Sequence, residues 1–131
     1  MELKEIIQNY FKEIDWNIEP KQLYTPISYA LESGGKRLRP MLTLMATKLF
    51  GGDINKAMPA AVALEIFHNF TLLHDDIMDR ADMRRNRPTV HVKWDDNTAI
   101  LSGDAMLIKA YQYLSKTETD KKEEILDLFT T

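Results

Sequence analysis

The feature that most constrains this chain is an apolar helical segment that leads directly into a cluster of aspartates. Residues 58–82 read MPAAVALEIFHNFTLLHDDIMDRAD. In a continuous helix Asp75, Asp79 and Asp82 recur one turn apart and share one face. Carboxylates near a helix C-terminus oppose the macrodipole, which favours cations at that end. The pattern therefore predicts a long helix over residues 54–80 that binds a hard divalent cation at its C-terminal end.

Mg²⁺ suits this cluster, because it takes one or two carboxylates and completes an octahedral shell with water and phosphate oxygens. Asp75 and Asp79 can each offer one oxygen to the same region, whereas Asp76 points about a quarter-turn away and is the weaker ligand. His68 lies two turns before Asp75 on the same face, so we expect it to be near the site. The alternatives are a solvated acidic helix end and a core histidine.

A cluster of opposite sign lies upstream, in the stretch GGKRLRP at residues 34–40. The two glycines predict a left-handed helix stop before a new helix begins. Lys36 and Arg39 are spaced to converge on one anion, whereas Arg37 diverges. Cations at a helix N-terminus oppose the macrodipole unless an anion such as phosphate binds there. The alternative is an ordinary basic surface turn.

Three more arginines, Arg84, Arg85 and Arg87, follow the aspartates. Guanidinium groups match phosphate geometry bidentately. A metal-chelated phosphate compound would satisfy both clusters. The net charge of −3 and the lack of aromatic residues among the basic ones argue against nucleic acid as a ligand.

Helical periodicity dominates the rest of the chain, and we predict an all-α fold. At 131 residues the chain forms one domain, and the absence of cysteine excludes disulfides and thiolate chemistry. The apolar stretch 57–73 is interrupted by polar residues, so we expect no membrane span, and the charged N-terminal segment makes a cytoplasmic protein the expectation. The predicted helices cover residues 3–14, 20–33, 38–50, 54–80, 97–114 and 121–129, with a loop over 83–95. An uncapped apolar face at the C-terminal end suggests a piece of a longer domain.

Three blocks of sequence together resemble the trans-type polyprenyl diphosphate synthases, an all-helical family of isoprenoid synthases. They are GGKRLRP (34–40), LLHDDIMDRADMRRNRPTVH (72–91) and AILSGDAML (99–107). The resemblance implies the isoprenoid synthase fold, with residues 1–131 as the N-terminal helices of a single polyprenyl synthetase domain truncated at its C-terminus. The implied reaction is Mg²⁺-dependent condensation of isopentenyl diphosphate with an allylic diphosphate to a short-chain product, farnesyl or geranylgeranyl diphosphate, by a homodimer.

The resemblance also implies roles for individual residues. Asp75 and Asp79 would hold Mg²⁺ on the allylic diphosphate, with Asp76 beside them and Arg84 on the same diphosphate. Phe70 would form the floor of the product pocket. Asn86 stands where the family usually has glycine, and we expect the turn to survive because asparagine tolerates left-handed geometry. The residues implied in binding isopentenyl diphosphate are Lys36, Arg39, His68 and Arg85.

One departure from the family bears on activity. The family needs a second aspartate-rich motif on a facing helix, and this chain has none. The chain by itself is therefore expected to be inactive. The alternative is a non-catalytic subunit or diphosphate-binding module. The dipeptide Gly103-Asp104 recurs in the family, but its chemical role does not follow from the sequence.

Overall fold

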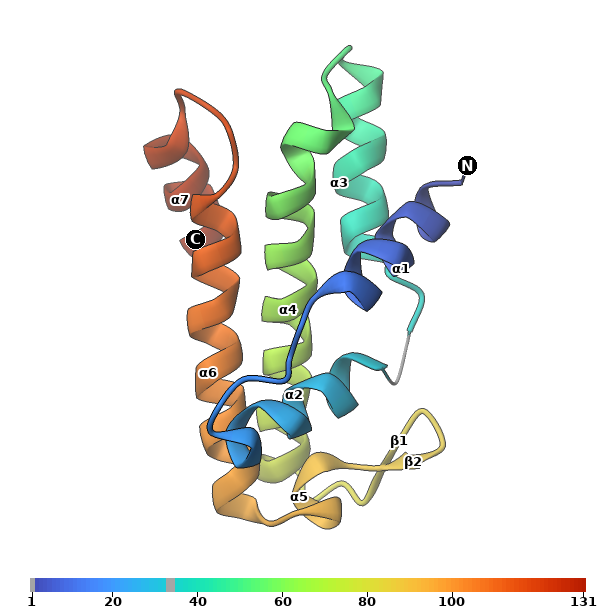
Figure 1. Cartoon of the computed structure of the whole chain (residues 1–131), viewed down its shortest axis with the longest axis vertical. Helices are drawn as coiled ribbons and strands as arrows, with labels where there is room; N and C mark the ends of the chain where they lie inside the picture. Colours follow the sequence, from blue (N-terminus) through green and yellow to red (C-terminus); the bar gives the residue numbers. More distant parts are fainter. Residues whose placement is uncertain (1, 33–34) are drawn as a thin grey trace.

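The chain forms a bundle of helices with one short hairpin, seen in a computed structural model that describes residues 2–32 and 35–131. Helices α3 (Leu38–Leu49), α4 (Ile54–Met78) and α6 (Asp96–Ser115) stand side by side, and α1 (Leu3–Glu13) and α2 (Lys21–Glu32) cross them (Figure 1). The all-α prediction is confirmed. The elements in chain order are α1 (Leu3–Glu13), α2 (Lys21–Glu32), α3 (Leu38–Leu49), α4 (Ile54–Met78), β1 (Met83–Arg84), β2 (Arg87–Pro88), α5 (Val90–Lys93), α6 (Asp96–Ser115) and α7 (Lys122–Thr130).

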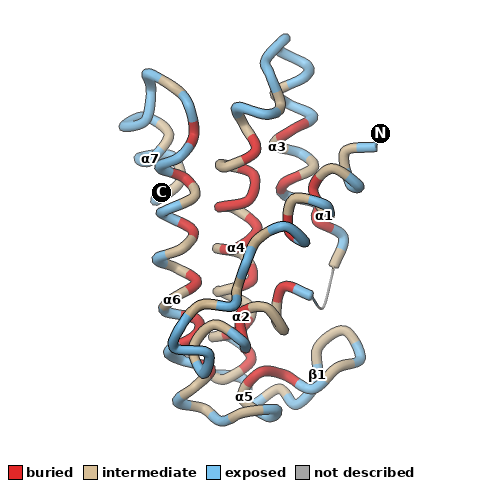
Figure 2. Tube along the Cα trace, in the orientation of Figure 1, coloured by how far each residue is buried: buried red, intermediate tan, exposed pale blue. Residues whose placement is uncertain are grey.

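Helix α4 is the centre of the bundle and packs against α2, α3, α5 and α6. Between residues 57 and 74 every residue of α4 is buried or half-buried (Figure 2), as expected for a helix that is surrounded by others. The Asp53 side chain accepts a hydrogen bond from the Asn55 backbone N–H at 2.9 Å and caps its N-terminus. Among the described residues, no helix is both long and apolar enough to span a bilayer.

The C-terminal end of α4 differs from the prediction. The helix ends at Met78 with Asp79 as its C-cap, so Asp82 lies beyond it and does not share the face of Asp75. The reason is a Schellman motif without glycine: Arg80 adopts a left-handed φ of 56°, and Ala81 N–H donates to the Asp76 carbonyl at 2.9 Å. Arginine rarely takes this conformation, so the sequence carries no signal for the stop.

The predicted loop over 83–95 also contains regular structure. Strands β1 and β2 pair antiparallel, with Met83 opposite Pro88, and the backbone turns through Arg85 and Asn86. Both turn residues have positive φ, 52° and 64°, as in the type I′ turns that suit two-residue hairpins. The expectation that Asn86 preserves the turn is confirmed. After the hairpin, Val90–Lys93 forms one helical turn.

A buried ion pair ties the start of α3 to the centre of α4. Arg37 Nη1 lies 3.1 Å from Glu65 Oε1, and both side chains are 3% exposed. Arg37 Nη2 donates to the Leu31 carbonyl at 2.6 Å, and the guanidinium lies 4.5 Å from the Phe11 ring centroid. These partners hold Arg37 in the core, whereas Lys36 and Arg39 are exposed. Its own φ of 53° is left-handed, whereas Gly34, part of the predicted stop, lies outside the described residues.

We expect Glu65→Ala to lower the free energy of unfolding by about 3–5 kcal/mol, because it leaves the buried Arg37 charge without its partner. Urea denaturation followed by circular dichroism measures this change. The matched control is Arg80→Ala, which breaks a pair with Asp96 whose side chains are 74% and 46% exposed and should cost less than about 1 kcal/mol. Equal losses in the two variants would contradict the structural role of Arg37 and Glu65.

Candidate functional site

Side chains from three separate segments converge on one basic pocket. Lys36 and Arg39 come from the start of α3 and the residues before it, His68 from α4, and Arg85 from the hairpin turn. The predicted convergence of Lys36 and Arg39 is thus present in the fold. Arg37 and Glu65 also line this pocket, with Leu38 between the basic residues. Several cations held close together in this way favour a polyvalent anion such as a diphosphate.

Gly35 lets the hairpin approach this loop closely. It has a φ of +100°, and a Cβ built on it would lie 2.8 Å from Arg85 Cζ. Any side chain at this position would be strained by the backbone and would displace the guanidinium. Gly35 therefore permits the left-handed turn and also leaves room for the Arg85 guanidinium.

Among the side chains that line this pocket, His68 is the one whose usual pKa lies near neutral pH. Its Nε2 lies 3.3 Å from Arg39 Nη1. Because a guanidinium only donates, Nε2 accepts and the ring proton resides on Nδ1. Burial lowers the pKa of His68 and the Arg39 charge lowers it further, with smaller contributions from Arg85 and Arg84, against an opposing effect of Glu65. Burial and the neighbouring cations therefore favour the neutral imidazole.

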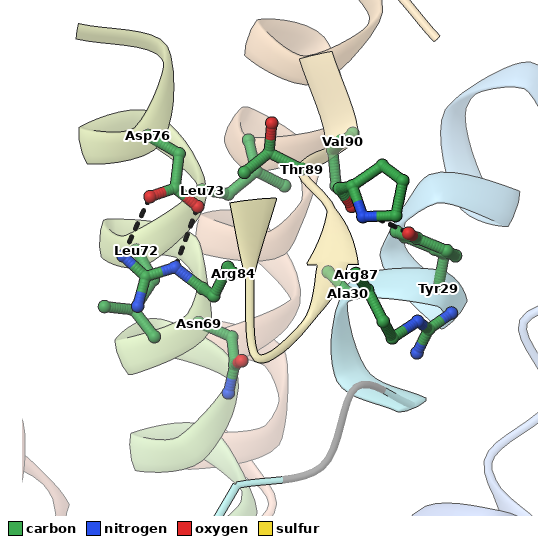
Figure 3. A pocket seen from close by; sticks show the side chains of 11 residues that line it. Tyr29, Ala30, Asn69, Leu72, Leu73, Asp76, Arg84, Arg87, Thr89 and Val90 are labelled. Atoms are coloured by element: carbon green, nitrogen blue, oxygen red, sulfur yellow. Dashed lines mark hydrogen bonds and ion pairs between the residues drawn. The ribbon is translucent and has the colours of Figure 1, made fainter. Parts of the chain in front are cut away.

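The acidic cluster at the end of α4 contains one buried carboxylate and two exposed ones. Asp76 is buried, and both its oxygens accept hydrogen bonds from Arg84 at 2.8 Å (Figure 3). This bond raises the pKa of Arg84, which is 37% exposed and faces the pocket between α4 and the hairpin. Asp75 and Asp79 are exposed, and the Asp79 N–H donates to the Asp75 carbonyl one turn earlier.

These two exposed aspartates fit half of a magnesium site. Within residues 2–32 and 35–131, no cluster of three or more acidic or histidine residues could hold a metal ion by itself. Mg²⁺ commonly takes one or two carboxylates and completes its shell with water and substrate phosphate. Asp75 and Asp79 offer that number, whereas the Asp76 oxygens already bind Arg84. A metal role for Asp76 stays a prediction.

Phe70 and Gly103 meet through the histidine that precedes the aspartates. Phe70 is half-buried and packs edge-on against His74, with ring centroids 4.8 Å apart. His74 Nε2 lies 3.2 Å from the Ile100 carbonyl and 3.8 Å from Asp104 Oδ1. A Cβ on Gly103 would clash with the same nitrogen. The dipeptide Gly103-Asp104 therefore lets α6 receive the His74 ring, a role that its sequence alone does not reveal.

The sequence did not indicate the residues that hold the hairpin. Tyr29, Asn69, Arg87 and Thr89 line a pocket together with Asp76 and Arg84 (Figure 3). No motif or spacing singles out Tyr29, which meets the hairpin across 59 positions of sequence. The ion pair between Asp76 and Arg84 spans only eight residues, but the turn between them runs through Arg80, whose left-handed backbone has no sequence signal.

We expect Gly35→Ala to weaken the binding of inorganic pyrophosphate, because the new Cβ displaces Arg85 from the basic pocket. Isothermal titration at fixed ionic strength measures the affinity. Gly51→Ala is the matched control: Gly51 also has a positive φ, 77°, but a Cβ there meets nothing within 4 Å. Both variants should lose about 1 kcal/mol of stability, and only Gly35→Ala should lose affinity. A parallel loss of affinity in both would contradict the role assigned to Gly35.

We expect His68 to make the chain less stable in mild acid. Burial and the Arg39 charge hold the pKa of His68 in the folded chain below its usual range, so the unfolded chain binds more protons. The contribution of neutral His68 to the free energy of unfolding is therefore fully present above the pKa that His68 has in the unfolded chain. It is lost as the pH falls through the pKa of His68 in the folded chain. Chemical denaturation between pH 7.5 and 5 measures the slope, and His68→Asn should flatten it. His91→Asn is the control, and an unchanged slope in His68→Asn would contradict the assignment.

Comparison with known proteins shows the family of the chain. The polyprenyl synthetase family model matches residues 20–131. The chain is 45% identical over 127 residues to the geranylgeranyl diphosphate synthase of Methanosarcina mazei, covering 92% of this chain and 39% of that protein. It is 41% identical to the short chain isoprenyl diphosphate synthase of Methanocaldococcus jannaschii, covering 97% of this chain and 39% of that protein.

Solved structures show the same likeness. The geranylgeranyl pyrophosphate synthetase of Pyrococcus horikoshii superposes with a TM-score of 0.87 at 40% identity, over 97% of this chain and 39% of the other. The chain thus spans about two fifths of the length of these relatives. The fold is that of the isoprenoid synthases, as the sequence predicted. The family model covers most of the sequence, and the chain belongs to the polyprenyl synthetase family.

Proposed function

We propose that the protein carrying this chain is a Mg²⁺-dependent prenyltransferase that joins isopentenyl diphosphate to an allylic diphosphate. The observation that carries the proposal is the convergence of Lys36, Arg39, His68 and Arg85 on one pocket, with exposed Asp75 and Asp79 at the end of the helix that bears His68. Two sites of opposite charge on one helix suit two diphosphate substrates, one bound directly and one through metal. The names of the relatives support a short-chain product, farnesyl or geranylgeranyl diphosphate.

Each group of residues has one task in this proposal. The basic pocket holds the diphosphate of isopentenyl diphosphate, while Arg84 and the aspartates Asp75 and Asp79 hold that of the allylic substrate. Bound Mg²⁺ supplies positive charge that stabilises the departing diphosphate. The allylic C–O bond breaks, the double bond of isopentenyl diphosphate attacks the cation, and loss of a proton restores an alkene. Phe70 and Leu72 exclude water from the cation.

Assembly and location complete the proposal. Helix α6 exposes apolar side chains, among them Leu101 and Ile108 at 58% and 61%. Such a surface supports a helix-to-helix contact between two copies, because apolar patches of this kind commonly mark interfaces. We therefore include a homodimer in the proposal. A cytoplasmic location, expected from the charged N-terminal segment, is also part of it.

The experiment that tests the activity is incorporation of labelled isopentenyl diphosphate with Mg²⁺ and an allylic primer, on this chain and on the full-length gene product. Activity in the full-length protein supports a synthase. Silence in both favours a non-catalytic subunit.

We expect Asp75→Asn to reduce kcat of the active protein by roughly 100-fold or more, because each 1.36 kcal/mol of lost transition-state stabilisation slows the reaction about tenfold. The exposed side chain should leave the circular dichroism spectrum unchanged. Asp82→Asn, an exposed aspartate beyond the helix, is the control and should keep its activity. Near-normal turnover in Asp75→Asn would refute the metal assignment.

We expect Phe70→Ala to lengthen the product, because it removes the floor of the pocket. Chromatography of the dephosphorylated products measures chain length. Phe50→Ala, at a side chain that is 87% exposed, should leave the product unchanged. If Phe70→Ala yields the same product distribution as the wild type, the floor of the pocket lies elsewhere.

A further inference from the structure

The hairpin that carries Arg84 and Arg85 is too small to hold its own shape. Each strand has two residues, and the register consists of Met83 opposite Pro88 and Arg84 opposite Arg87. Even longer isolated two-stranded hairpins are only marginally stable in water. The position of both arginines must therefore depend on contacts outside the hairpin.

Contacts to α4 and to the turn after it hold one side. Arg84 forms its bidentate pair with Asp76, and the Thr89 hydroxyl donates to the Ala81 carbonyl at 2.8 Å. The Thr89 N–H also donates to the Asp82 carbonyl at 3.0 Å. These bonds fix β1 and the exit of β2 relative to the aspartates, but they do not reach the side of the hairpin that faces α2.

Tyr29 of α2 contacts that other side. Its hydroxyl donates to the Pro88 carbonyl at 2.7 Å. Arg87 Cζ lies 4.0 Å from its ring centroid and Lys93 Nζ lies 4.6 Å from it, so the ring also attracts cations on both flanks of Pro88. Figure 3 shows Tyr29 beside Arg87 at the edge of the hairpin, away from Arg84.

Tyr29 is also connected to the basic pocket through the chain. It lies in the last turn of α2, and the residues that follow lead to Gly35 and Lys36. The guanidinium of Arg85 rests against Gly35. The hairpin thus meets the α2 side at two points, at its base through Tyr29 and at its tip through Gly35. Holding the base sets where Arg85 arrives relative to Lys36.

We propose that Tyr29 is a positioning residue for diphosphate binding: its hydroxyl anchors the hairpin so that Arg85 stands in the basic pocket before the ligand arrives. Tyr29 does not line that pocket and acts through the hairpin. An arginine already held in place loses less conformational freedom on binding, which strengthens binding without adding a contact. The inference rests on the proposed function, because it takes a diphosphate as the ligand.

Tyr29→Phe tests the inference, because it removes the hydroxyl and keeps the ring that stacks with Arg87. We expect the affinity for inorganic pyrophosphate to fall roughly three- to tenfold, the range for one lost hydrogen bond. Amide hydrogen exchange at Thr89 and in the hairpin should become faster, with the thermal midpoint of the bundle nearly unchanged. Tyr24→Phe is the matched control, since Tyr24 lies on the same helix and its hydroxyl makes no hydrogen bond among the described residues.

A double-mutant cycle separates positioning from a general structural effect. In an Arg85→Gln background, Tyr29→Phe should lose most of its effect on pyrophosphate affinity, because the residue through which it acts is gone. An equal effect in both backgrounds would overturn the proposal, as would unchanged affinity or exchange in Tyr29→Phe. Failure of the wild-type chain to bind pyrophosphate would instead contradict the proposed ligand, and with it the proposed function.

Discussion

The buried contact between Arg37 and Glu65 joins four helices at one point. The guanidinium lies over Phe11 of α1, donates to the Leu31 carbonyl in α2 and pairs with Glu65 of α4, while Arg37 itself precedes the first residue of α3. Glu65 Oε1 also accepts from Asn69 Nδ2 at 3.0 Å, so its charge is well supported. A buried charge is costly without such partners. The pair therefore holds the connection between α2 and α3 in one place, and Lys36 and Arg39 are placed with it.

The same logic recurs at the C-terminal end of α4. Asp76 is buried and would be costly alone, but Arg84 satisfies both of its oxygens. This pair sets the hairpin against α4, while Tyr29 and Gly35 set it against the α2 side. Each charged pair thus uses one member of a cluster as structural support. The remaining members are Asp75 and Asp79 on one side and Lys36, Arg39 and Arg85 on the other, and in the proposed function these are the charges that contact the ligands.

Helix positions followed from local signals where those signals exist. Asp53 caps α4 through a contact that needs only its neighbours in sequence. The end of α4 differs from the prediction, because Arg80 takes a conformation that local preference disfavours and that the surrounding bonds enforce. The predicted loop contains the hairpin, because two-residue strands are too short to show alternation. The roles of Tyr29, Gly103 and His74 do not follow from the sequence, because they depend on partners far away along the chain.

The sequence by itself determined the all-helical class and the identity of the charged groups, because periodicity and residue chemistry are local properties of the chain. It did not determine where Arg37 points, because Arg37 precedes α3 in a left-handed conformation to which helical spacing does not apply. Only the tertiary structure decided which charges support the fold and which face a ligand. That choice depends on burial, which is set by how α1, α2 and the hairpin pack on α4 and cannot be read from any one segment.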